Sequence, residues 1–236
     1  MPAVPSSFAL RDMPLLQGLS AERLETLARQ CRWRSTEAQI SLVANAAPDA
    51  DLYLLVSGRV RVTTYSAGGR QVTFSDYDAG DYFGEVAAVD GRPRSADVLT
   101  LEPSVLAVLP RADFLALMRD EPLIGQRVME RLAGMVRRLS GRVVELSTLN
   151  VQQRLWAELL RLAQAGGAAV DGNQARLTPV PKHMDLASRI STNREQVARE
   201  LSALSREGLV RKEGKTLLLA DLATLRARLE AAREEA

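Results

Sequence analysis

The stretch FGEVAAVDGRPRSA, residues 83–96, places a Gly-Glu pair, a short spacer and an Arg-Ser pair between runs typical of β-strands. The guanidinium of Arg94 can bind a phosphate through two parallel charge-assisted hydrogen bonds, and the Ser95 hydroxyl can donate to a remaining oxygen. The Glu85 carboxylate can accept a hydrogen bond from a ribose hydroxyl, and Gly84 allows the backbone to approach a sugar closely. The pattern indicates a site for a cyclic phosphodiester on a ribose. The simpler alternative for so short a motif is a solvated surface loop.

Short runs of strand type surround this motif between residues 38 and 110. In residues 59–64 apolar and polar side chains alternate, so we expect Arg59 and Arg61 on the solvent face. Glycine-containing turns separate the runs near residues 57–58, 68–69 and 78–80. Many short strands joined by such turns predict an antiparallel jelly roll or barrel.

Helical patterns lie on both sides of this region. Residues 14–32 predict a helical entry segment with Ser20 as its N-cap, and Cys31 is expected to be a small core residue. Residues 111–149 predict a long helix with one apolar stripe. The stripe comprises Val128, Leu132, Met135, Val136, Leu139, Val143, Leu146 and Leu149. Further helices are predicted from Asn150 to about Ala165 and over residues 221–235, and we assign no role to the last one.

Residues 180–219 contain a second functional pattern. A short helix over 182–189, a polar turn at 191–193 and a second helix over 194–207 are followed by two short strands around Gly214. This order of elements predicts a winged helix-turn-helix.

The start of the second helix carries three residues that can read DNA bases. Arg194 and Arg199 can each bond bidentately to guanine, and Glu195 can accept from cytosine. A solvated helix face is the alternative for any one of them. Neighbouring polar residues can contact phosphates, which position a protein without specifying sequence. These candidates are Lys182, His183, Ser191, Thr192, Asn193 and Lys215. His183 can equally be an ordinary helix residue.

Three segments occur in order: LYLLVSGRV at 52–60, GDYFGE at 80–85 and PRSA at 93–96. Together they resemble the cyclic-nucleotide-binding β-roll of the cyclic-AMP receptor protein and fumarate-nitrate regulator superfamily of bacterial transcription factors. The run REQVAR at 194–199 resembles the Arg-Glu-x-x-x-Arg recognition helix of the same superfamily. The resemblance covers residues 14 to about 219. One departure is the absence, around Ile40, of glycines that are usual in the family.

The resemblance implies an α+β protein with three parts: a cyclic-nucleotide-binding β-roll (1–124), a dimerisation helix (125–149) and a winged helix-turn-helix DNA-binding domain (150–236). It implies a nucleotide site that comprises Gly84, Glu85, Val86, Arg94, Ser95, Leu139 and Ser140. Leu139 and Ser140 align with a Thr-Ser pair that reads adenine in the founding member. Leu139 cannot hydrogen-bond a base edge, whereas Ser140 can, so this departure bears on nucleotide identity.

The implied function is a homodimeric transcription regulator that responds to cyclic AMP, with cyclic GMP as the alternative. Its ligand would reorient the recognition helices onto a TGTGA-like palindrome in double-stranded DNA, and RNA polymerase is an expected partner. A regulator of the same fold that acts without nucleotide, or senses another small molecule, remains an alternative. A regulatory subunit of an enzyme is a further one.

Composition restricts the remaining function classes. The 236 residues carry a formal net charge of +2 and include one Cys and one His. An intrachain disulfide, a four-cysteine cluster and a His-rich metal or haem site are therefore not expected. We find no catalytic motif and expect no enzyme. The absence of a signal peptide and of an apolar run of about 18 residues fits a cytoplasmic protein without a membrane span.

Overall fold

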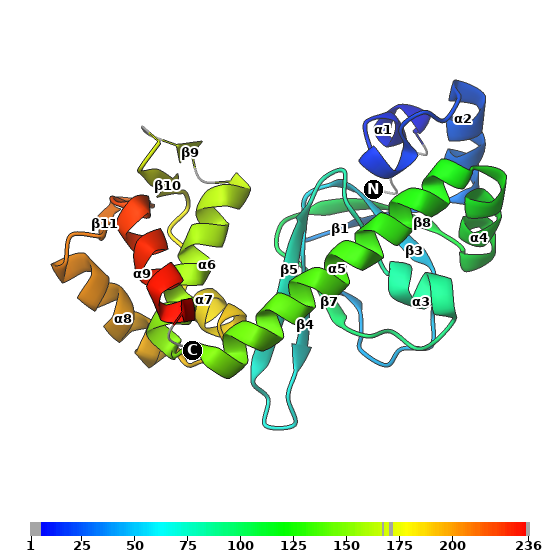
Figure 1. Cartoon of the computed structure of the whole chain (residues 1–236). Coiled ribbons are helices and arrows are strands. Elements are labelled where there is room, and N and C mark those ends of the chain that lie inside the picture. The colour runs from blue at the N-terminus through cyan, green and yellow to red at the C-terminus, as the bar shows by residue number, and fades with distance from the viewer. Residues whose placement is uncertain (1–5, 167, 170–171, 235–236) are drawn as a thin grey trace. The chain divides into compact units, whose positions relative to one another are not determined.

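The computed structural model describes residues 6–166, 168–169 and 172–234, which form two compact units (Figure 1). The first unit extends to Val136 and the second begins at Arg137. The division therefore falls within the long helix α5 (Pro122–Thr148). Within the described ranges, no helix combines the length and apolar character that crossing a membrane requires.

Two four-stranded antiparallel sheets form the centre of the first unit, in the orders β1-β8-β3-β6 and β2-β7-β4-β5. Their strands are β1 (Arg32–Thr36), β2 (Ser41–Val43), β3 (Leu52–Ser57), β4 (Arg59–Tyr65), β5 (Gln71–Asp78), β6 (Tyr82–Phe83), β7 (Asp97–Thr100) and β8 (Ser104–Leu109). Leu55, Val60 and Leu106, which come from both sheets, are fully buried in one apolar cluster. This arrangement confirms the predicted β-roll.

Helices pack against the first of these sheets. They are α1 (Ser7–Arg11), the 3-10 helix η1 (Pro14–Leu16), α2 (Ala21–Gln30), α3 (Glu85–Asp90), α4 (Arg111–Asp120) and the first part of α5. Their apolar side chains join the sheet in a second cluster that includes Leu27, Phe114 and Val128. Ser20 caps α2, because its side chain accepts from the Arg23 N–H at 3.1 Å. Cys31 lies in this cluster as predicted, and burial raises the pKa of its thiol to about 12.

The continuous helix predicted over residues 111–149 is wrong at one point. α4 ends at Asp120 and α5 begins at Pro122, while Glu121 between them has a φ of −125° and a ψ of 85°. A residue that precedes proline is disfavoured in the helical region, whereas proline itself suits the first helical position. The apolar stripe that indicated the helix begins at Val128, after the break, so its periodicity did not locate the start of α5.

The prediction for Arg61 is also wrong. This side chain is 7% exposed, and it pairs with Asp76 on the neighbouring strand through bonds of 2.8 and 3.0 Å. Arg61 lies directly opposite Asp76 in the β4–β5 ladder, so the pair neutralises both charges away from water. Alternation within β4 carries no information about a partner on β5. Arg59 lies nearer the solvent, with its side chain 41% exposed.

The second unit is a winged helix-turn-helix, as predicted. Its elements after α5 are α6 (Val151–Gly166), β9 (Ala168–Ala169), β10 (Ala175–Leu177), α7 (His183–Arg189), α8 (Arg194–Arg206), β11 (Val210–Glu213), β12 (Thr216–Leu219) and α9 (Leu222–Glu234). The predicted two-stranded wing is part of a larger sheet of order β11-β12-β10-β9. One apolar cluster, including Leu159, Leu186 and Leu225, joins α6, α7 and α9.

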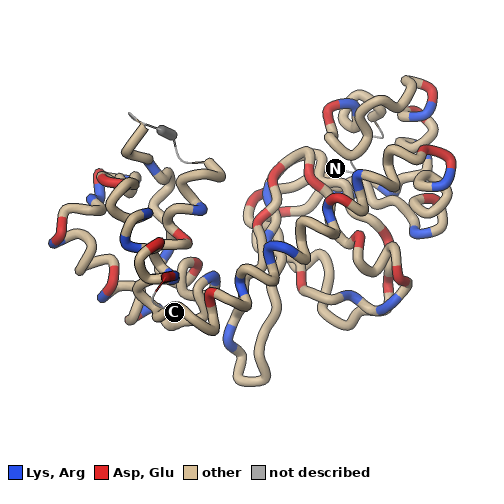
Figure 2. Tube along the Cα trace, viewed as in Figure 1, with Lys and Arg blue, Asp and Glu red and all other residues tan. Residues whose placement is uncertain are grey.

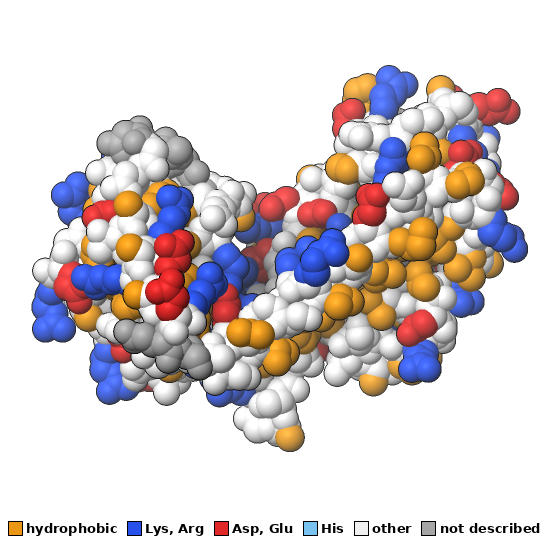
Figure 3. Space-filling model, viewed as in Figure 1, with side chains coloured by type: hydrophobic (Ala, Val, Ile, Leu, Met, Phe, Trp, Pro, Cys, Tyr) orange, Lys and Arg blue, Asp and Glu red, His pale blue; other side chains and the backbone are white. Residues whose placement is uncertain are grey.

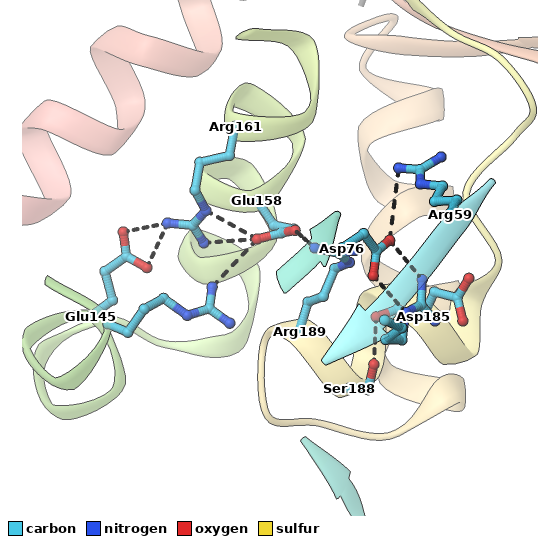
Figure 4. A network of polar contacts seen from close by, with 10 residues as sticks. Arg59, Asp76, Glu145, Glu158, Arg161, Asp185, Ser188 and Arg189 are labelled. Atoms are coloured by element: carbon cyan, nitrogen blue, oxygen red, sulfur yellow. Dashed lines mark hydrogen bonds and ion pairs between the residues drawn. The ribbon is translucent and has the colours of Figure 1, made fainter. Parts of the chain in front are cut away.

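Buried charges hold the end of α5 to this unit (Figure 4). Glu158 on α6 is 3% exposed, and its Oε2 accepts from Arg142 of α5 at 3.3 Å and from Arg161 at 3.0 Å. Arg161 also donates to both oxygens of Glu145, at 2.8 and 2.9 Å. Arg189, at the end of α7, reaches the other oxygen of Glu158 at 3.5 Å. We call the helix-turn-helix formed by α7 and α8 the reading head. Its first helix, α7, is thereby tied to α6 and to the last turns of α5.

Candidate ligand site and nucleic-acid surface

The motif at residues 83–96 is an ordered turn and helix. Gly84 has a φ of +86° and links β6 to the short helix α3. A Cβ at this position would lie 2.5 Å from Nη1 of Arg94 and 3.0 Å from the backbone oxygen of Asp51. Both the left-handed backbone and the close approach therefore require glycine here.

Arg94 is buried, at 4% exposure, and its guanidinium is enclosed by protein acceptors. Nη1 donates to the carbonyl of Gly84 at 3.1 Å, and Nη2 donates to the carbonyl of Asp51 at 2.7 Å. Nε donates to Oδ2 of Asp49 at 3.1 Å, and Nη2 donates to the same oxygen. The guanidinium also lies over the ring of Tyr53, 5.3 Å from its centroid. We call residues 83–96 the cassette. Because these groups hold it from several sides, Arg94 is a fixed positive charge at the end of the cassette.

Glu85 is the second buried charge of the cassette, at 3% exposure. Its Oε1 accepts from Nε of Arg131, on α5, at 3.1 Å. Arg131 also donates to Oδ1 of Asp81 at 3.2 Å and to the carbonyl of Tyr82 at 2.5 Å. Burial opposes the charge on Arg131, but Glu85 and the nearby Tyr77 hold its pKa above the ordinary value.

The remaining cassette candidates are less enclosed. Ser95 is exposed, and Val86 is partly buried in the first turn of α3. Leu139 and Ser140 are exposed on the part of α5 that belongs to the second unit. Their role as reporters of the base stays a prediction from the resemblance.

Two residues of the cassette environment were missed at the sequence level: Asp49 and Arg131. Asp49 comes from the loop between β2 and β3, about 45 positions before its partner, and no local spacing relates the two. Arg131 lies on the predicted dimerisation helix, where a charged residue outside the apolar stripe is expected to be exposed to solvent. In each case the partner becomes visible only when the tertiary structure is known.

The three predicted base-reading residues share the exposed start of α8. Asn193 caps this helix, because its side-chain oxygen accepts from the Gln196 N–H at 2.8 Å. Arg194, Glu195 and Arg199 are exposed, while Val197 is buried in the core of the unit. Arg199 donates to the side-chain oxygen of Gln196, one turn earlier on the helix. The arrangement leaves one face of α8 free to enter a groove.

The predicted phosphate-contacting residues lie on α7, on the turn before α8 and on the wing. Lys182, Asn193 and Lys215 are exposed, whereas His183, Ser191 and Thr192 are partly buried. Ser191 has a φ of +53°, and the Thr192 N–H bonds to the carbonyl of Ala187. Figure 2 shows basic and acidic residues interspersed along this unit, so no single charge sign dominates it.

Comparison with known proteins assigns both units to described families. Residues 34–121 match the family model of the cyclic nucleotide-binding domain, and residues 153–228 match that of the Crp-like helix-turn-helix domain. The chain is 31% identical over 207 residues to the cyclic AMP receptor protein of Thermus thermophilus, covering 86% of this chain and 90% of the relative. It is 26% identical over 207 residues to a CRP-like cAMP-activated global transcriptional regulator of Mycobacterium tuberculosis, covering 88% and 92%.

A solved structure of a CooA mutant from Carboxydothermus hydrogenoformans superposes on the chain with a TM-score of 0.76. The sequence identity is 20%, and the superposition covers 90% of this chain and 92% of that chain. At this identity the likeness shows the fold alone.

Proposed function

Because the chain belongs to the superfamily of cyclic-AMP receptor proteins and fumarate-nitrate regulators, and is a transcription regulator with nucleotide-binding and Crp-like helix-turn-helix domains, we propose that a cyclic nucleotide controls its affinity for DNA. The observation that carries the proposal is the pair of buried opposite charges, Arg94 and Glu85, at the cassette. A cyclic phosphodiester supplies an anion for Arg94, and its ribose 2′-hydroxyl supplies a donor for Glu85.

The nucleotide is proposed to be cyclic AMP, with cyclic GMP as the alternative. The names of the relatives from Thermus thermophilus and Mycobacterium tuberculosis include cyclic AMP. Ser140 can hydrogen-bond a base edge, whereas Leu139 offers only apolar contact. Selection between the two purines would then rest on fewer polar contacts than a Thr-Ser pair provides.

The active form is proposed to be a homodimer joined through α5. Large apolar side chains are exposed along this helix, and hydrophobic side chains gather there in Figure 3. They are Leu123, Met129, Val136, Leu139, Val143, Val144 and Leu146. A second copy would bury such a stripe, and two-fold symmetry would place two α8 helices on successive half-sites of a TGTGA-like palindrome. The function is regulatory and cytoplasmic, with RNA polymerase as the expected further partner and no catalytic step.

A regulator of the same fold that acts without nucleotide is the second candidate. It is favoured by the internal ion pairs, because Asp49 already neutralises Arg94 and Arg131 already neutralises Glu85.

Calorimetric titration with cyclic AMP and with cyclic GMP, each with and without a TGTGA-type palindrome, separates these candidates. We expect one nucleotide to bind and the DNA to tighten that binding, because coupling between two sites is reciprocal. If DNA binds while neither nucleotide does, the second candidate is correct. If a nucleotide binds with the same affinity whether or not DNA is present, the ligand does not control the reading head.

The DNA contact is tested by Arg199→Ala. We expect a loss of about 1–3 kcal/mol on a half-site that contains the guanine, with relaxed selectivity at that base pair. Arg206→Ala, at the far end of the same helix, is the matched control and should leave the affinity nearly unchanged. An equal loss from Arg199→Ala on all DNA sequences would reassign Arg199 to a phosphate contact.

A further inference from the structure

Nε and Nη2 of Arg94 form a fork of two N–H donors that is suited to a phosphate, and this fork already holds a carboxylate. Nε and Nη2 both donate to Oδ2 of Asp49. A guanidinium has five N–H donors, and two further ones are directed to the carbonyls of Gly84 and Asp51. Four of the five donors are therefore in use, and a bidentate phosphate cannot bind until one of these acceptors leaves.

The three acceptors differ in how freely they can leave. The carbonyls of Gly84 and Asp51 belong to backbone next to β6 and β3, so they move only with the sheet. The Asp49 side chain is 43% exposed, whereas that of Arg94 is 3% exposed. Asp49 can therefore rotate into water, where its charge is well solvated, while Arg94 stays in place.

The position of Asp49 is built into the fold. The loop that carries it is hydrogen-bonded to the backbone of Arg94 on both sides, because Ala46 N–H donates to the Arg94 carbonyl at 2.8 Å and Arg94 N–H donates to the Ala47 carbonyl at 2.9 Å. These two bonds place Asp49 beside the guanidinium of the residue they pair with. The contact between Asp49 and Arg94 therefore follows from the way this loop pairs with the backbone of Arg94.

We propose that Asp49 is an internal competitor for the ligand phosphate, an anion held on Arg94 that a cyclic nucleotide must displace. This inference rests on the proposed nucleotide site and adds a residue that sets its affinity. In the unliganded protein Asp49 compensates the buried charge of Arg94. When ligand enters, the two anions compete for one fork, so part of the binding free energy is spent on releasing Asp49.

Asp49→Asn tests the proposal, with Asp51→Asn as the matched control. Both variants remove one negative charge from the same loop. The Asp51 carboxylate, however, faces Arg32 and the Arg111 N–H, while its carbonyl still holds Arg94. We expect Asp49→Asn to tighten cyclic AMP binding about threefold or more in calorimetry, the scale of a half-exposed ion pair. Asp51→Asn should stay within about twofold of the wild type.

Thermal unfolding gives a second readout. Without nucleotide, Asp49→Asn should melt at a lower temperature than the wild type, since Arg94 loses its counter-charge. Saturating cyclic AMP should raise the melting temperature more in the variant than in the wild type.

Each other outcome overturns the inference in a recognisable way. Wild-type affinity in Asp49→Asn would mean that Asp49 does not compete, and the proposed nucleotide site would stand. Weaker binding would mean that Asp49 positions Arg94 for the ligand. Equal tightening in both variants would reduce the effect to general charge repulsion. If neither the wild type nor the variants bind cyclic AMP or cyclic GMP, the nucleotide proposal fails and this inference fails with it.

Discussion

Gly84 determines how closely the backbone approaches Arg94. Its φ of +86° places it in the left-handed region, and a Cβ would lie 2.5 Å from the Arg94 guanidinium. We expect Gly84→Ala to lower the free energy of unfolding by about 1–3 kcal/mol from backbone strain, and to weaken nucleotide binding further because Arg94 must move. Chemical denaturation and calorimetry measure the two effects.

Gly69→Ala is the matched control for that substitution. Gly69 also has a positive φ, of +76°, but an added Cβ would meet no atom within 4 Å. This variant should therefore show the strain without the loss of ligand affinity. Equal effects of the two substitutions on nucleotide binding would mean that the close approach to Arg94 has no functional role.

At this scale the sequence brings the proposed ligand groups together in one motif, but it does not predict the charged residues that surround them. Arg94, Glu85 and Gly84 share one short motif whose chemistry can be read locally. Asp49 and Arg131 complete the charge balance from distant parts of the chain, and no periodicity relates them to the motif. Local spacing identifies candidate ligand groups, whereas the counter-charges of buried residues depend on the tertiary fold.

α5 is the element that connects the cassette to the rest of the chain. Arg131 on this helix compensates the charge of Glu85, which is nearly inaccessible to water. The Arg131 guanidinium also lies over the rings of Tyr77 and Tyr82, 4.7 and 4.1 Å from their centroids. Removal of one partner from a buried ion pair leaves the other charge uncompensated. We therefore expect Arg131→Gln to lower the unfolding free energy by about 3 kcal/mol in chemical denaturation.

Arg137→Gln, an exposed position on the same helix, is the control and should change stability by less than about 0.5 kcal/mol. A similar small change for Arg131→Gln would mean that water or another group compensates Glu85. In the proposed nucleotide site, a ribose hydroxyl bound to Glu85 would compete with Arg131 for one carboxylate.

Helix starts followed from the sequence where a capping residue marks them. Ser20 was expected at a helix start, and its side chain accepts the capping bond. Asn193, which caps α8, lies in the polar turn predicted at 191–193. The break between α4 and α5 at Pro122 was missed because the apolar stripe begins only at Val128 and does not locate the start of the helix. The pairing of β10 with β12 was missed because a strand of three residues, Ala175–Leu177, gives no pattern of its own.

On the scale of the whole molecule, the proposed dimer depends on the exposed apolar stripe of α5. Val136 and Val143 are each 63% exposed and lie seven residues apart, so they share one face of the helix. A charge at both positions cannot be buried against the same face of a second copy without a large desolvation cost. The double substitution Val136→Glu and Val143→Glu should therefore give a monomer in sedimentation velocity at micromolar concentration.

Two further properties of that variant follow from the same geometry. Cyclic AMP binding should remain measurable, because Arg94 and Glu85, the charged residues of the proposed site, are unchanged in this variant. Affinity for a palindromic site should fall toward that for a single half-site, since two tethered reading heads gain from effective concentration and separate ones do not. Met184→Glu, at an exposed apolar position on α7, should leave the oligomeric state unchanged. A dimer that survives the double substitution would place the contact between copies on another surface.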